Sequence, residues 1–233
     1  MKLGLFRKES SADGKRTVYL CGVRLFSYRG KRARRRGEAS VSVNGPGNSV
    51  SCRAARNPQL RVVVHGSGNV VQIDAEGFAG DVYVGTPDCP VSGCRVVVGE
   101  GTTSNGVLVM LMESGSSATI GRDCMISSGV VMQGSDTHCI FDADGRLVNA
   151  GRGISVGDHV WIGRDVKIAK NTAVPSNCIV GMGSVVTKSF DEENCVVAGV
   201  PAKVVKRGVS WSRQRPQAYL DEKGADSCAA FLV

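Results

Sequence analysis

The chain has 233 residues, a formal net charge of +8 and only 5% aromatic residues. It has no apolar run near the roughly 20 residues that span a bilayer, and its start lacks the apolar centre of a signal peptide. Its nine cysteines show no CxxC pair or other metal-ligand spacing. This composition argues against a membrane-spanning, disulfide-stapled or zinc-binding protein, and it favours one continuous domain with free thiols in a reducing cytoplasm.

The N-terminal segment carries the most concentrated charge. We expect residues 1–40 to form a cap that precedes any repeat, and a basic run extends from Lys31 to Arg36. Such a run is usually a solvated loop, and a second interpretation is contact with an anionic membrane surface. Nucleic acid is not an expected partner, because no aromatic residues are interleaved with the basic ones.

A period of six residues runs through the second half of the chain. The hexads begin at aliphatic anchors, and the fifth residue of each hexad is mostly small or β-branched. The anchors are Val156, Ile162, Ile168, Val174, Val180 and Val186, and the fifth residues are Val160, Val166, Thr172, Cys178, Ser184 and Phe190. A helix repeats near 3.6 residues and a strand near 2, so a period of six indicates short strands joined by bends.

Three strand-and-bend units close one triangular coil, and coils stacked about 4.8 Å apart form a parallel β-helix. The fifth residue lies two before the next anchor, so both face inward. Glycine follows the anchor at positions 157, 163 and 181, where we expect it to supply the backbone angles of the bends. We therefore predict an all-β domain over residues 41–200, irregular until about Ile120.

One insertion interrupts the repeat. Further hexads start at Ile120, Ile126 and Met132 and end at Thr137, and residues 138–155 then lose the pattern. Asp144-Gly145 is a two-residue hairpin signal. We predict that the insertion is a loop pushed out of the wall.

The C-terminal part, residues 201–233, departs from the repeat. We expect a short helix from about Pro201, which would bring Lys203 and Lys206 onto one side because they are three residues apart. From Ser212 onward the chain has no repeat, and this tail is interpreted either as a segment that wraps a neighbour or as a disordered one.

Four segments occur in the order and spacing of a known family. They are SDTHCIFDADG (135–145), GISVGDHVWIGRDVKI (153–168), IVGMGSVVTKSF (179–190) and VVAGVPAKVVKR (196–207). Over about 99–211 the chain thus resembles the hexapeptide-repeat acyltransferases, which are left-handed β-helices. The general handedness rule points the other way, so the left hand is implied by the resemblance alone. The SDTH phrase is especially similar to the O-acetyltransferases of capsule and lipopolysaccharide assembly.

The resemblance implies a reaction and its catalytic residue. It implies transfer of an acetyl group from acetyl-CoA to a sugar hydroxyl, with His138 as general base. A hydroxyl is a poor nucleophile, and imidazole can accept a proton near neutral pH. Asp136 either orients that imidazole or only stabilises a turn. His159 occupies an outward position at which the family often has asparagine, so a catalytic role is not expected.

The donor site also follows from the resemblance. It places Lys203 and Lys206 at the 3′-phosphate of coenzyme A, with solvated charge as the alternative. Trp161 borders the pantetheine arm or a neighbouring subunit in the resembling enzymes, and plain packing is the other interpretation. Backbone amides at Gly181 and Gly199 are candidate cofactor contacts, because glycine permits close approach. No metal is expected.

The family implies closed homotrimers with sites at the subunit clefts. We expect the acceptor to be a sugar or lipid-linked saccharide and the location to be the cytoplasm, with contact at the inner face of the membrane through the basic run as a second interpretation. Two alternatives stay open: N-acetylation of an amino sugar, and a catalytically silent β-helix that only binds or scaffolds. A carbonic anhydrase of the same fold is not supported, because His65, His138 and His159 lack zinc-ligand spacing.

Overall fold

The computed structural model describes residues 6–10, 15–20, 23–29, 38–53 and 59–224. The basic run from Lys31 to Arg36 lies outside these ranges, so the interpretations of it remain predictions. At the N-terminus, three strands form an antiparallel sheet of their own in the order β1-β2-β3. They are β1 (Phe6–Ser10), β2 (Lys15–Leu20) and β3 (Val23–Arg29).

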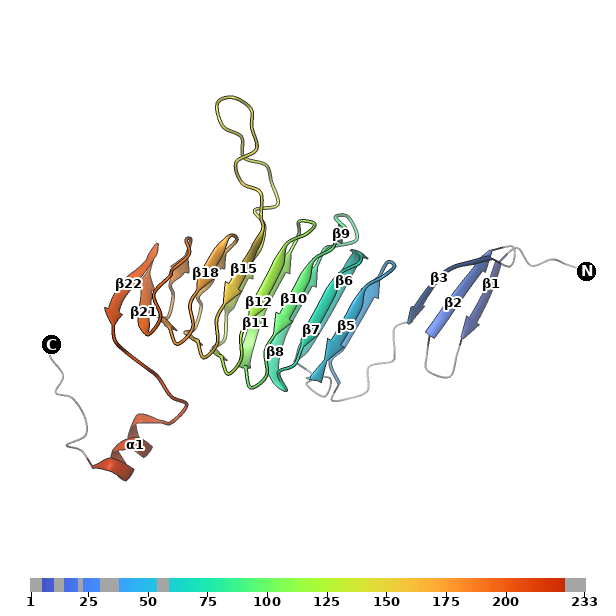
Figure 1. Ribbon diagram of the computed structural model, residues 1–233. Coiled ribbons are helices and arrows are strands. Elements are labelled where there is room, and N and C mark those ends of the chain that lie inside the picture. The colour runs from blue at the N-terminus through green and yellow to red at the C-terminus, as the bar shows by residue number, and fades with distance from the viewer. Residues whose placement is uncertain (1–5, 11–14, 21–22, 30–37, 54–58, 225–233) are drawn as a thin grey trace, which may run out of the picture.

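The body of the chain is a parallel β-helix whose coils are stacked side by side (Figure 1). One wall is a six-stranded sheet in which each strand pairs in parallel with the strand one coil away. Its strands are β5 (Ser49–Cys52), β7 (Val70–Ile73), β10 (Arg95–Val98), β12 (Ser117–Ile120), β15 (Gly153–Val156) and β18 (Thr172–Val174).

The other two walls join through long upstream strands and separate into short strands downstream. The upstream strands are β4 (Ser40–Asn44), β6 (Leu60–Ser67), β8 (Gly77–Val84), β9 (Val91–Ser92) and β11 (Thr103–Leu111). Below the first part of β11 lie β13 (Met125–Ile126), β16 (Trp161–Ile162) and β19 (Ile179–Val180), and below its second part lie β14 (Val130–Gln133), β17 (Lys167–Ala169) and β20 (Val185–Val186).

The hexad prediction is confirmed by burial. Every anchor from Ile120 to Val186 and every fifth residue from Val160 to Phe190 is buried, and all of them except the polar Thr172 and Ser184 belong to one continuous hydrophobic core. Full burial of a valine or isoleucine side chain contributes about 1.5–3 kcal/mol. Aliphatic repetition is therefore the main source of stability in the coils, and the predicted fold class, an all-β parallel β-helix with a protruding loop and a short C-terminal helix, is confirmed.

The predicted role of the glycines after the anchors is wrong. The bends place the fourth residue of the hexad in the left-handed region, as at His159 (φ 54°) and Asn177 (φ 60°). Gly157 and Gly163 serve a different purpose: a Cβ on either would lie 2.5 Å or 2.7 Å from a backbone nitrogen of the next coil. Adjacent coils approach so closely at these corners that no side chain fits.

The insertion is a protruding hairpin, as predicted (Figure 1). An antiparallel bridge joins Phe141 to Leu147, and Asp142 Oδ1 accepts the amide hydrogens of Asp144 and Arg146 to close the turn. The loop is shorter than the predicted 138–155, because its last residues already form β15. We define the loop as residues 138–152.

The C-terminal helix is not where the sequence placed it. Instead of a helix from Pro201, β21 (Cys195–Gly199) pairs antiparallel with β22 (Ala202–Arg207). The last coil leaves an open strand edge, and consecutive valines favour an extended backbone beside it. The one helix in the described part of the chain is α1 (Pro216–Lys223), which buries no residue. No described helix is long and apolar enough to cross a bilayer.

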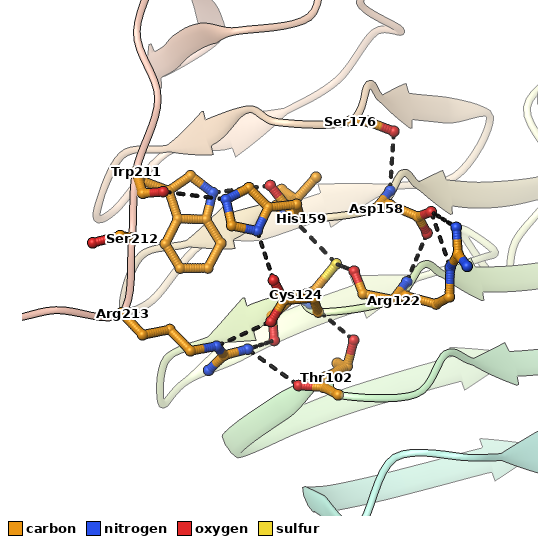
Figure 2. Close-up of polar contacts among 12 residues, drawn as sticks. Thr102, Arg122, Cys124, Asp158, His159, Ser176, Trp211, Ser212 and Arg213 are labelled. Atoms are coloured by element: carbon orange, nitrogen blue, oxygen red, sulfur yellow. Dashed lines mark hydrogen bonds and ion pairs between the residues drawn. The ribbon is translucent and has the colours of Figure 1, made fainter.

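Residues 208–215 join β22 to α1, and we call them the C-terminal strap. The indole of Trp211 stacks on His159, with ring centroids 4.2 Å apart and planes 10° apart (Figure 2). Its Nε1 donates to the carbonyl oxygen of His159 at 2.9 Å. The guanidinium of Arg213 donates to the carbonyl oxygen of Cys124 at 2.9 Å. The strap is therefore fastened to coils far upstream of it in sequence.

Candidate active site

His138 stands where the chain leaves the wall, five residues after the end of β14. It is exposed, and it lines a cavity of about 480 Å³ at the base of the loop. The lining also includes Met110, Met112, Glu113, Leu147 and Asn149. An exposed imidazole that lines a mostly apolar cavity is accessible both from solvent and to a ligand in the cavity.

Asp136 is engaged with groups other than the His138 ring. Its carboxylate pairs with the ammonium of Lys170 and accepts a hydrogen bond from Asn149 Nδ2 at 2.9 Å. The hydrogen bond from Lys170 and then that from Asn149 lower the pKa of Asp136 below its ordinary value. Within the described residues, no hydrogen bond joins this carboxylate to the His138 imidazole.

The link from Asp136 to His138 runs through the backbone. Asn149 Nδ2 also donates to the carbonyl oxygen of His138 at 2.8 Å, and Asn149 Oδ1 accepts the amide hydrogen of Ile140 at 2.9 Å. Asn149 therefore ties the two limbs of the loop together beside His138. The sequence analysis missed Asn149 and Lys170, because a single amide in a loop and one lysine in a hexad carry no pattern.

His159 fastens the C-terminal strap to the wall. Its Nδ1 lies 2.8 Å from Asp123 Oδ2, and its Nε2 lies 3.1 Å from the carbonyl oxygen of Trp211. The hydrogen bond with His159, followed by that with Arg213, holds the pKa of Asp123 below its ordinary value. Both ring nitrogens of His159 are thus used in fastening the C-terminal strap.

Trp161 faces outward on β16, where it is 39% exposed. It sits in the wall between Met125 of the coil above and Ile179 of the coil below. Its ring centroid lies 6.2 Å from that of Trp211, with the planes tilted by 47°. The strap therefore flanks one side of Trp161 and leaves the rest of the indole open to a ligand or a neighbouring subunit.

Lys203 and Lys206 share the outer face of β22 for a reason that the sequence did not show. Residues three apart on a regular strand point to opposite faces. Here Lys203 pairs with Ala198 and Lys206 with Val196, and an irregularity around Val205 shifts the register between them. Because paired residues share a face, both lysines point outward, and neither forms an ion pair with a described residue.

The amides of the two candidate glycines are already used. Gly181 N–H donates to the carbonyl oxygen of Val197 at 2.8 Å, and Gly199 N–H donates to Ser184 Oγ at 3.1 Å. Neither amide is free to bind a cofactor in this structure. A Cβ on Gly181 would lie 2.9 Å from that of Ala198, so close packing against β21 explains this glycine. Among the described residues, no group of three or more His, Cys, Asp or Glu could hold a metal.

Comparison with known proteins gives several relatives that are named as O-acetyltransferases. No family model matches the chain. A polysialic acid O-acetyltransferase from Escherichia coli is 31% identical over 143 residues, which are 60% of this chain and 46% of the relative. One from Neisseria meningitidis is 39% identical over 124 residues, or 53% of this chain and 57% of the relative. A putative lipopolysaccharide biosynthesis O-acetyl transferase from Escherichia coli K12 is 36% identical over 101 residues, which are 39% of this chain and 50% of the relative. The chain spans about half the length of these relatives.

Two solved structures extend the likeness over most of the chain. The crystal structure of the polysialic acid-specific acetyltransferase NeuO has a TM-score of 0.64 and 29% identity, covering 77% of this chain and 91% of that one. The structure of the polysialic acid O-acetyltransferase OatWY gives a TM-score of 0.55 and 25% identity, and the match covers 78% of this chain and 96% of that one. The predicted resemblance to the hexapeptide-repeat acyltransferases, and to their polysaccharide O-acetyltransferases in particular, is confirmed.

Proposed function

We propose that this protein is an acetyl-CoA-dependent O-acetyltransferase that acetylates a sugar hydroxyl in surface polysaccharide biosynthesis. The observation that carries the proposal is the position of His138. The residue that the SDTH phrase singles out is exposed and lines the cavity at the base of the loop. The matched relatives are O-acetyltransferases of polysialic acid and lipopolysaccharide.

His138 acts as the general base. Its imidazole removes the proton of the acceptor hydroxyl as that oxygen attacks the thioester carbonyl of acetyl-CoA. A carbon–oxygen bond forms, the tetrahedral oxyanion is stabilised by a backbone amide, and the carbon–sulfur bond breaks. The proton held by His138 then passes to the departing thiolate. Asp136 supports the base indirectly, through Asn149 and the backbone of His138.

Coenzyme A lies along the outer wall in this proposal. Trp161 offers an exposed aromatic face to the pantetheine arm, and it is backed by Trp211 of the strap. Lys203 and Lys206 present two ammonium groups on one face of β22, which suits the 3′-phosphate. Gly181 and Gly199 donate their amide hydrogens within the protein, so the proposal gives these two amides no contact with the cofactor.

The active assembly is a homotrimer in the cytoplasm, with the acceptor supplied as a free or lipid-linked saccharide at the inner face of the membrane. The loop favours contact with a neighbouring subunit, because its four large apolar side chains are 50–60% exposed in the single chain. They are Ile140, Phe141, Leu147 and Val148. A cyclic interface that covers them would also close the cavity beside His138.

The test is transfer of radiolabelled acetate from acetyl-CoA to a panel of capsule and lipopolysaccharide saccharides, with polysialic acid among them. Label released by mild alkali is an ester and supports O-acetylation. Label that survives alkali is an amide and would establish the N-acetyltransferase alternative. If calorimetry shows no acetyl-CoA binding and no saccharide is labelled, the chain is the silent binding module instead.

A further inference from the structure

Glu113 lies in the turn after β11, one coil upstream of the loop, and it holds both ends of that loop. Its Oε1 accepts the hydroxyl hydrogen of Ser135 at 2.5 Å, and its Oε2 accepts the amide hydrogen of Gly151 at 2.6 Å. Ser135 is the last buried residue before the loop, and Gly151 belongs to its returning limb. We call Glu113, Ser135 and Gly151 the neck.

A short relay runs from the neck to the candidate base. Ser135 Oγ also accepts the amide hydrogen of Thr137 at 2.9 Å. Thr137 has a φ of 64°, which β-branched residues rarely adopt, so its conformation needs support from its surroundings. His138 follows directly. The carboxylate of Glu113 is thereby connected, through Ser135 and Thr137, to the backbone position from which His138 projects.

The neck also leaves little room for adjustment. A Cβ added to Gly151 would lie 2.3 Å from the carbonyl oxygen of Gly134 and 3.0 Å from Glu113 Oε1. The outgoing limb and the carboxylate therefore pack against the side of Gly151 from which a side chain would project. Glu113 itself lines the cavity beside His138.

We propose that Glu113 is a positioning residue of the transfer reaction, whose carboxylate closes the neck and so sets where His138 meets the acceptor. This inference rests on the proposed function for its kinetic part only. A carboxylate can accept both neck hydrogen bonds, whereas an amide accepts with one end and donates with the other. Glu113→Gln keeps the size of the side chain but loses the charge, and its amide meets Ser135 only by donating to an oxygen that already accepts the amide hydrogen of Thr137, which weakens the neck.

The regular wall offers a matched control. Asp158 also links two coils, because its Oδ1 accepts the amide hydrogen of Arg122 at 2.7 Å and its Oδ2 accepts from the Arg122 guanidinium at 2.7 Å. Asp158 is not part of the cavity lining beside His138. Asp158→Asn therefore removes an equivalent clamp between coils without touching the neck.

The first measurement needs no enzyme activity. Hydrogen exchange of the native protein, followed by mass spectrometry, reports the amides of Thr137 and Gly151 in peptides that cover the two limbs. Glu113→Gln should speed exchange in both peptides at least fivefold, and Asp158→Asn should leave them unchanged. Unchanged exchange in Glu113→Gln would overturn the neck itself, whatever the protein catalyses.

The second measurement is kinetic. Glu113→Gln should lower kcat at least tenfold, while the KM for acetyl-CoA changes by less than twofold. The melting temperature of Glu113→Gln should fall no further than that of Asp158→Asn. Ser135→Ala should also lower kcat. The double variant should lose less than the product of the two single losses, because both residues act through one contact.

Retention of more than half of the wild-type kcat by Glu113→Gln would refute the positioning role. A parallel loss of kcat, acetyl-CoA affinity and melting temperature would reduce Glu113 to a structural residue. Failure of the wild type to transfer acetate would instead refute the proposed function.

Discussion

The regular coils and the loop are built on opposite principles. Between Gly153 and Val186, each hexad buries its anchor and its fifth residue, and the wall repeats with little variation. Between residues 138 and 152, four large apolar side chains are exposed, and polar contacts to other coils hold the segment. Stability comes from the repeated wall, and the proposed base, His138, stands where the repeat is interrupted. Coils can thus be kept while the chemistry is altered, and the following predictions test that separation.

The largest effect should come from emptying the core. Ile168 is 1% exposed on β17, and Ile168→Ala should lower the free energy of unfolding by about 2–5 kcal/mol. Asp142→Ala opens the turn of the loop and should change it by less than about 1 kcal/mol, because the turn is at the surface. Denaturant melts of both variants provide the test. Similar losses for the two would contradict the division between wall and loop.

The sequence predicted the regular coils better than it predicted the contacts that hold the loop and the C-terminal strands. The anchors and fifth residues were predicted because each lies six residues from the next like position, and the hairpin turn followed from Asp144-Gly145. The prediction of a helix from Pro201 was wrong, because residues 202–207 pair with the open edge of β21 and form a strand. Glu113 escaped notice, because it meets Gly151 38 residues later, and only the closed coils bring them together.

The next effect concerns the base. His138→Ala should lower turnover at least about 100-fold, the usual scale for loss of a general base, with the melting temperature unchanged because the side chain is exposed. Radiolabelled acetate is the suitable readout, since a thiol reagent would also report the nine cysteines. A variant that keeps more than a tenth of wild-type turnover would remove His138 from this role.

A smaller effect is expected at the donor end of the wall. Replacing Lys203 and Lys206 together with alanine should raise the KM for acetyl-CoA roughly tenfold, which corresponds to about 1.4 kcal/mol of lost binding, and change the acceptor KM little. Acetyl-dephospho-CoA is the matched control, because it lacks the phosphate in question. Equal use of the two donors by the wild-type protein would leave the lysines without a phosphate to bind.

The smallest expected effect is the pH dependence of the stability that the Arg122–Asp158 ion pair contributes to the regular coils. Arg122 holds the pKa of Asp158 below its ordinary value of 3.8, first by the hydrogen bond from its side chain. The stabilisation is therefore complete above that value and is lost as the pH falls through the folded pKa. Asp158→Asn should melt roughly 1–2 °C lower at pH 7, and the difference should shrink below about pH 4, because exposed ion pairs contribute little. A difference that grows in acid would have the wrong sign.

The separation of wall and loop is tested most directly by shortening residues 142–150 in the full chain. Because the deletion removes Leu147 and Val148, the oligomer itself is not the readout; the account predicts that the coils keep the wild-type melting temperature and bind acetyl-CoA with unchanged affinity in calorimetry. Transfer of radiolabelled acetate by the same sample should fall by about 100-fold or more, because His138 and the acceptor lose their positioning contacts. An unfolded product, or a folded one that still transfers acetate at the wild-type rate, would contradict it.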